Sequence, residues 1–232
     1  MDKILQRLKQ EFSGWQRWEM IFIFSCTIIM GAISVYLGDN WLGILSAVSG
    51  TLYTMFAGKG KISCYFFGII NTVAYGYIAY SQKIYGDMML NWAIYLPMMF
   101  AGIIMWKRRL NDDCSVIKTR LTPGMQLLLI GINTAAIFGY AFILSRYAAA
   151  QPLLDSTTTV LSITAIFLTL KRCIEQWILW TAVNLLSVLM WFRVFFTTGG
   201  TNAATLLWWM IMLISGIIFF IQWKNSLSEK RS

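Results

Sequence analysis

The residues best suited to binding a ligand lie in one short segment of the chain. Trp177, Trp180, Asn184, Ser187 and Trp191 recur at spacings of three and four residues, so they share one face of a helix. An indole ring stacks on flat rings and attracts cations, and a carboxamide hydrogen-bonds hydroxyl groups or another carboxamide. The pattern indicates recognition of a small, flat, polar molecule. The alternative for the two leading tryptophans is an aromatic belt at a membrane interface.

A similar segment occurs earlier, and it predicts an internal duplication. Residues 61–71 and 174–184 both begin at a basic loop and place an Asn near the middle of an apolar stretch. The predicted equivalent pairs are Cys64 and Trp177, Phe67 and Trp180, and Asn71 and Asn184. Because an Asn in hydrocarbon costs several kcal/mol without a partner, we expect Asn71 and Asn184 to face each other across a pseudo-twofold axis and bind ligand. The alternative is an interhelical hydrogen bond that holds the helices together.

Other polar side chains extend the candidate site. Gln176 adds a carboxamide beside Trp177, and Asn91 and Tyr95 lie shortly before Pro97. A proline bends a helix and frees a backbone carbonyl, as a moving helix requires, and a simple packing kink is the alternative. Asp155 is either a helix cap or a carboxylate that binds the ligand.

The chain lacks the residues of an enzyme. It has no His, and it shows no Ser–His pair, glycine-rich phosphate loop or paired carboxylates within a span. The four cysteines lack paired spacing, so we expect neither disulfides nor a metal site. We therefore expect no catalytic residues and no cofactor.

The composition is that of a membrane protein. Of the 232 residues, 58% are hydrophobic and only 12% are charged, which is too few to cover a soluble domain of this size. A crossing helix needs about 20 apolar residues. Eight such spans are predicted, at residues 20–37, 41–57, 62–80, 88–106, 125–144, 153–170, 174–196 and 203–223.

The basic residues set the orientation. With the N-terminus inside, sixteen of the 19 Lys and Arg fall in cytoplasmic segments, and only Lys83, Arg146 and Arg193 fall outside. This strong positive-inside bias predicts that both termini are cytoplasmic. It also explains the net charge of +9 without a nucleic-acid partner.

The predicted fold is an all-α integral membrane protein with two parallel three-helix repeats and a linker span between them, a 3+1+3 arrangement with one additional N-terminal span. Parallel repeats follow because one span separates the two units. The predicted boundaries are an amphipathic segment at 1–19, which lies on the inner leaflet, an N-terminal span at 20–38, a first bundle at 40–110, a linker at 125–146 and a second bundle at 152–225.

The motifs resemble those of a known family. Residues Lys61–Asn71 resemble the third-span signature of the PnuC nicotinamide riboside transporters. Asp155-Ser156, Val160–Ser162 and the run from Glu175 through Trp180 to Asn184 resemble the second-half signature of that family. The resemblance covers roughly residues 40–225.

The resemblance implies a SWEET-like fold, homotrimers in a bacterial inner membrane, and facilitated diffusion of nicotinamide riboside, a vitamin B3 form used for NAD biosynthesis. Net uptake is then driven by a cytoplasmic riboside kinase, which phosphorylates the riboside after entry. The substrate-binding residues expected from motif and resemblance together are Trp177, Trp180, Asn184, Asn71, Gln176, Asn91, Tyr95 and Asp155.

The sequence leaves two other functional hypotheses open. Relatives in the wider family carry thiamine or riboflavin, and thiamine also has a cationic ring that stacks on indole. A membrane scaffold or sensor, in which the polar stripe only locks helices together, belongs to a different class of protein.

Overall fold

The computed structural model describes residues 11–36, 38, 41–81, 83, 85–111, 114–147, 151–197 and 203–229. Over these residues the chain forms helices joined by turns, together with three isolated β-bridges. The helices fall into two compact units, Met1–Ile117 and Lys118–Ser232, which are described separately.

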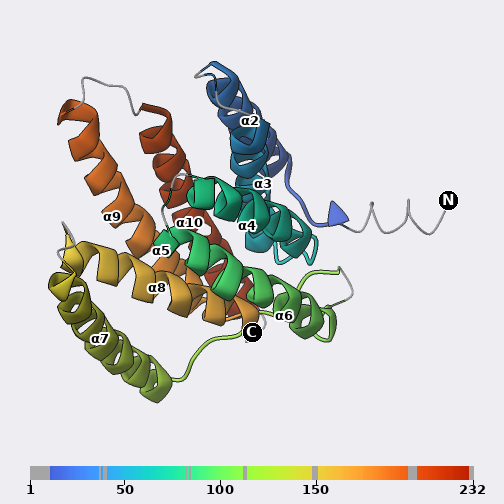
Figure 1. The fold of residues 1–232 in the computed structure, drawn as a ribbon. Coiled ribbons are helices and arrows are strands. Elements are labelled where there is room, and N and C mark those ends of the chain that lie inside the picture. The colour runs from blue at the N-terminus through green and yellow to red at the C-terminus, as the bar shows by residue number, and fades with distance from the viewer. Residues whose placement is uncertain are drawn as a thin grey trace. The chain divides into compact units, whose positions relative to one another are not determined.

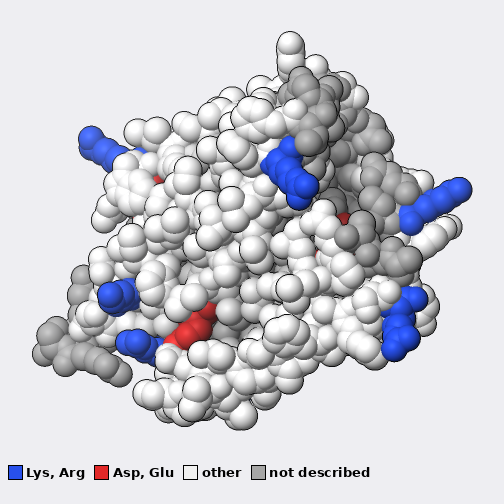
Figure 2. Space-filling view, turned by 90° about the vertical axis from the view of Figure 1, so that its left-hand side faces the viewer, with Lys and Arg blue, Asp and Glu red and all other residues white. Residues whose placement is uncertain are grey.

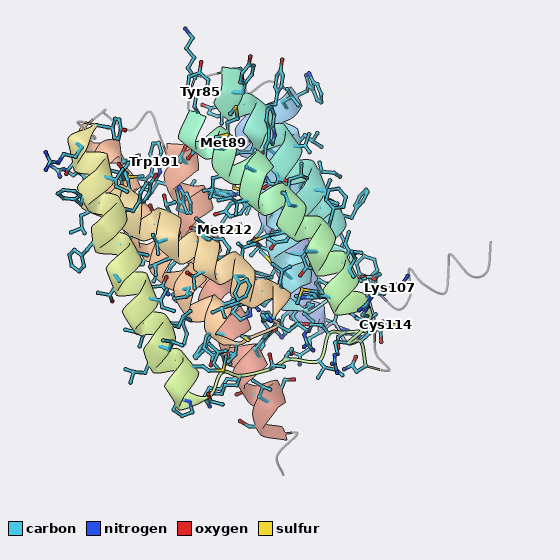
Figure 3. All side chains as sticks on the ribbon, turned by 60° about the horizontal axis from the view of Figure 1, so that its bottom comes forward. Tyr85, Met89, Lys107, Cys114, Trp191 and Met212 are labelled. Carbon is cyan, nitrogen blue, oxygen red and sulfur yellow. The ribbon has the colours of Figure 1, made fainter. Side chains whose placement is uncertain are left out.

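The first unit, blue to green in Figure 1, contains four membrane-length helical segments. These are α2 (Arg17–Tyr36), α3 (Trp41–Gly58), α4 (Cys64–Ser81), and a column of α5 (Tyr85–Met89), η1 (Leu90–Tyr95) and α6 (Leu96–Lys107). Within the unit, α3 packs against α2 and α4, and α4 packs against the column. In Figure 3, Tyr85 and Lys107 mark the two ends of this column.

The second unit, yellow to red in Figure 1, also contains four helices. These are α7 (Pro123–Arg146), α8 (Pro152–Leu170), α9 (Glu175–Thr197) and α10 (Ala203–Glu229). Here α8 packs against α7 and α9, and α9 packs against α10. The extensive pairing of α9 with α10 matters for function, because α9 carries the tryptophan and asparagine stripe.

The predicted all-helical membrane fold is confirmed, and every predicted span corresponds to a helical segment within a few residues of the expected bounds. Six segments of the described chain are long and apolar enough to cross a membrane, and α4 and α9 are not among these six. α4 carries polar side chains in mid-helix, such as Asn71 and Thr72, which lower its hydropathy. Figure 2 shows that charged side chains are sparse on the visible face.

Pro97 changes the helix around it, as expected from its missing N–H, but the change is a π-helical segment. The six residues Leu90–Tyr95 precede Pro97 as η1, and the N–H of Leu96 donates to the carbonyl oxygen of Asn91, five residues earlier. Such π segments are frequent at functional sites. Two candidate residues, Asn91 and Tyr95, lie on η1.

The two turns that precede α4 and α9 have the same backbone hydrogen bonds. The N–H groups of Gly60 and Lys61 donate to Ala57 and Phe56, just as those of Arg172 and Cys173 donate to Thr169 and Leu168. Gly60 and Arg172 both have positive φ, at 68° and 62°. This local repetition supports the predicted duplication.

The repeated turn also corrects the predicted register of the duplication by one residue. The N–H groups of Cys64 and Tyr65 donate to Lys61 and Ile62, and those of Gln176 and Trp177 donate to Cys173 and Ile174. The equivalent pairs are therefore Cys64 with Gln176, Tyr65 with Trp177, and Thr72 with Asn184.

The ring contacts agree with the corrected register. Tyr65 meets Trp106 edge to face at 5.0 Å, and Trp177 meets Trp223 edge to face at 5.8 Å. The predicted pairing of Asn71 with Asn184 is thus wrong, because successive residues of a helix point about 100° apart.

The N-terminal segment and the start of α2 pack on the last turn of α3 and on the residue that follows it. Phe12 and Trp15 lie 5.9 and 5.2 Å from the ring of Phe56, and Glu19 pairs with Lys59 at 2.8 Å. The first ten residues of the predicted amphipathic helix lie outside the described part of the chain.

Candidate functional site

The candidate site is built on one face of α9. Gln176, Trp180, Asn184 and Ser187 follow each other at spacings of four and three residues, so their side chains lie within one helical stripe. Gln176, Asn184 and Ser187 are buried, whereas Trp180 is half-buried. At 1.5 Å per residue the stripe from Gln176 to Asn184 rises about 12 Å.

Asn184 differs from the other asparagines of the spans. The amide nitrogens of Asn71, Asn91 and Asn133 each donate to a backbone carbonyl oxygen, at 2.8, 2.9 and 2.8 Å. Asn184 is only 7% exposed, yet its carboxamide has no hydrogen-bond partner among the described residues. The amide atoms of Asn184 are not among the fully buried atoms that lack a partner, so its carboxamide stays accessible and is suited to a ligand or to water.

Asn71 holds helices together in the first unit. Its amide nitrogen donates to the carbonyl oxygen and to the hydroxyl of Ser46 on α3, at 2.8 and 3.2 Å. Gly50 makes room for it, because a Cβ there would lie 2.8 Å from that nitrogen. Asn71 therefore fulfils the interhelical role that was its alternative, while its carbonyl oxygen makes no hydrogen bond within the described chain.

The two tryptophans of α9 have different environments. Trp177 is 3% exposed, and its ring lies 5.2 Å from Phe219 and 5.8 Å from Trp223, both on α10. Its indole N–H is buried and has no hydrogen-bond partner among the described residues. Trp180 is half-buried. Trp180 is therefore the ring available for stacking, and Trp177 is a donor held in an aromatic cluster.

Two neighbours of Trp177 are buried polar groups. Gln176 is 1% exposed, and its amide nitrogen has no partner within the described chain. Glu175 is buried, and its Oε1 accepts a hydrogen bond of 2.8 Å from Gln126. Gln176 and Trp177 therefore place two unused donors at the start of α9.

Helix α10 carries a further buried indole donor. The indole N–H of Trp208 is buried without a hydrogen-bond partner in the described residues, and its ring lies 4.6 Å from Trp209. Gly216 lets α10 approach Thr181 on α9, since a Cβ there would lie 2.8 Å from the Thr181 hydroxyl oxygen. Figure 3 labels Trp191 on α9 and Met212 on α10, the two helices that make this contact.

The remaining candidates lie elsewhere. Asn91 is 6% exposed and donates to Asp87, and Tyr95 is half-buried on the same π segment. Asp155 is exposed in the first turn of α8, whose N-cap is Gln151. The prediction that Asp155 caps the helix is thus wrong, because the N-cap lies four residues earlier, at Gln151. A carboxylate in the first turn still interacts favourably with the helix dipole.

Charge distribution limits what the spans can bind. No Lys or Arg occurs in residues 41–58, 62–82, 84–106, 123–145, 152–170, 174–192 or 203–223. A phosphate at that depth would have no cation to pair with, and burying it would be expensive. Aromatic faces and carboxamides instead suit a ligand with hydroxyls and a flat ring.

Comparison with known proteins gives one consistent result. The model of the nicotinamide mononucleotide transporter family matches residues 40–225. The chain is 34% identical to the nicotinamide riboside transporter PnuC of Neisseria mucosa, over 93% of this chain and 84% of that protein. It is 36% identical to the PnuC of Haemophilus influenzae, over 80% of this chain and 84% of that protein.

A solved structure is similar over nearly the whole chain. The crystal structure of the vitamin B3 transporter PnuC superposes with a TM-score of 0.82 at 34% identity, covering 96% of this chain and 97% of that one. The fold and the sequence motifs therefore point to the same group of proteins.

Proposed function

Because this chain belongs to the nicotinamide mononucleotide transporter family, we propose that it carries nicotinamide riboside across a bacterial inner membrane by facilitated diffusion. Its relatives in Neisseria mucosa and Haemophilus influenzae bear the name of riboside transporters. The chain is a multi-pass membrane protein and not an enzyme, so the cytoplasmic phosphorylation that pulls uptake belongs to a separate riboside kinase.

One observation supports the binding role above the others. Among the asparagines of the described spans, Asn184 is buried without a hydrogen-bond partner, and it shares a helix face with Trp180 and Gln176. In the proposed complex Trp180 stacks on the pyridinium ring, and Asn184, Gln176 and Trp177 bind polar groups of the ligand. Asn71, Asn91, Tyr95 and Asp155 are further proposed contacts, of which Asn71 and Asn91 already make protein hydrogen bonds.

The charge distribution favours the riboside over the mononucleotide named by the family. A pyridinium riboside brings one cationic ring and neutral hydroxyls, which aromatic rings and amides can bind. The mononucleotide adds a phosphate, and the central parts of the spans hold no Lys or Arg for it. Transport itself is proposed to proceed by alternating access, in which two bundles rock about the bound ligand. The proposed assembly is a homotrimer with both termini in the cytoplasm.

The test is calorimetric titration of the purified protein with nicotinamide riboside, in competition with thiamine, riboflavin and nicotinamide mononucleotide. We expect saturable binding of the riboside and weaker binding of each competitor. Trp180→Ala should weaken binding about tenfold or more, since stacking on a cationic ring contributes about 1–2 kcal/mol.

The matched control is Trp41→Ala, which removes an indole that is 70% exposed at the start of α3. That variant should bind as the parent chain does. Equal binding by the Trp180→Ala variant would refute the stacking role, and tighter binding of thiamine would change the substrate.

A further inference from the structure

Glu175 is a buried carboxylate held by two neutral donors. It is 7% exposed, and its Oε1 accepts from the N–H of Leu121 at 3.1 Å and from the amide of Gln126 at 2.8 Å. Arg120 lies farther away, at 4.0 Å, with a side chain that is 60% exposed. The carboxylate therefore joins the first turn of α9 to the first turn of α7 chiefly by hydrogen bonds and by its favourable place at a helix N-terminus.

The hydrogen bonds of Glu175 lie beside two side-chain donors of the site that have no partner. Gln176 and Trp177 follow directly, and the side-chain nitrogens of both lack partners in the described chain. The backbone beside them is held by the same segment, because the N–H of Ile174 donates to Thr119 and that of Thr119 donates to Arg172, both at 2.9 Å. With no hydrogen bonds of their own, the two donors depend on the first turn of α9 for their positions.

The equivalent position in the first unit is also held from outside its bundle. In the corrected register Ser63 corresponds to Glu175, and the Ser63 hydroxyl donates to the carboxylate of Glu11. Glu11 precedes α2, as Leu121 precedes α7. In each unit, then, the start of the third helix is bonded to the segment that precedes the first helix.

We propose that Glu175 is a positioning residue for the substrate: through Leu121 and Gln126 it fixes the first turn of α9, and with it the Gln176 and Trp177 donors. This role rests on the proposed function. A preorganised site saves the cost of ordering its side chains on binding. Loosening the turn therefore raises the Kd for the ligand without removing any group that contacts it.

The test compares three variants in detergent by calorimetry with nicotinamide riboside and by thermal melting. Gln126→Leu removes the donor at similar size, and we expect Kd to rise about fivefold to tenfold. Glu175→Gln keeps the acceptor oxygen, and we expect Kd within about threefold of the parent value. The double variant Glu175→Gln with Gln126→Glu exchanges the two ends of the hydrogen bond, and we expect it to bind more tightly than Gln126→Leu.

Asn225→Leu, an exposed position near the cytoplasmic end of α10, is the control and should leave Kd unchanged. The calorimetric stoichiometry reports the fraction of protein that is folded, so Kd refers to folded molecules alone. A Gln126→Leu variant with a lower melting temperature and an unchanged Kd would overturn the positioning role, as would a double variant no better than Gln126→Leu. If Glu175→Gln does not fold, the Gln126→Leu result decides. A parent chain that does not bind the riboside at all would overturn the proposed function, and the positioning role with it.

Discussion

At the scale of single residues, the amide side chains of this protein divide into two groups with different physical roles. The amide nitrogen of Asn133 on α7 donates to the carbonyl oxygen of Leu129, and its amide oxygen accepts a hydrogen bond of 2.7 Å from the hydroxyl of Thr164 on α8. The carboxamide is therefore satisfied both as a donor and as an acceptor. Asn184 is as deeply buried but has no such partner among the described residues. The same residue type thus contributes to helix packing at one position and remains available at the other.

This contrast makes a paired prediction. Asn184→Ala should lower the melting temperature little and should weaken riboside binding about tenfold, because the lost hydrogen bonds are to the ligand. Asn133→Ala should do the reverse, costing about 1 kcal/mol of stability with little change in affinity. Melting curves and calorimetry on both variants check this. Strong destabilisation by Asn184→Ala would place it among the structural amides.

At the scale of the elements, η1 distinguishes the fourth helical segment of the first unit from its counterpart α10 in the second. The π segment Leu90–Tyr95 precedes Pro97, whereas α10 is α-helical throughout its described length, Ala203–Glu229. A helix interrupted in this way has fewer regular hydrogen bonds and bends more easily. The first unit therefore has a built-in position at which a helix can change shape.

Replacing Pro97 should show whether that position serves transport. Pro97→Ala restores an N–H, so we expect a higher melting temperature, an unchanged Kd for the riboside and a lower maximal uptake rate. Pro152→Ala is the control, because Pro152 occupies the first turn of α8, where a proline is tolerated. Uptake by the Pro97→Ala variant at the parent rate would show that the π segment has only a packing role.

At the scale of the whole molecule, the distribution of basic residues predicts the orientation in the membrane. The connection that follows α6 contains Cys114, which is partly exposed, while Cys26, Cys64 and Cys173 are buried. Cys173 lies in the turn before α9, and burial raises the pKa of its thiol. Because the thiolate is the reactive form, Cys173 reacts slowly near neutral pH and faster only as the pH rises.

Thiol labelling near neutral pH should therefore report mainly on Cys114. We expect a membrane-impermeant maleimide to leave intact cells unlabelled and to label the protein after permeabilisation, with the label lost in Cys114→Ser. Labelling of intact cells at Cys114 would invert the predicted topology.

Much of the fold could be predicted from composition and charge. Each span is an apolar stretch of sequence, and most basic residues lie in the loops between spans. The bounds predicted for the eight helical segments are therefore close to the observed ones. The site was predictable in part, because Trp180 and Asn184 share a face at helical spacing. Neither the partner of Asn71 nor the burial of Glu175 could be predicted, since both depend on side chains from another helix or loop.

The sequence by itself determined that the protein lies in a membrane, how many helices it has and which residue types are available to a ligand. It could do so because hydropathy, charge and helical period are local properties of the chain. The tertiary structure alone decided the register of the duplication and the division of the amides. An apolar helix tolerates alignment shifted by one residue, so matching Asn with Asn was plausible, whereas the hydrogen bonds of the turns at Gly60 and Arg172 allow one alignment only. Which amide is satisfied depends on what a neighbouring helix places beside it, and that is known only once the helices have packed.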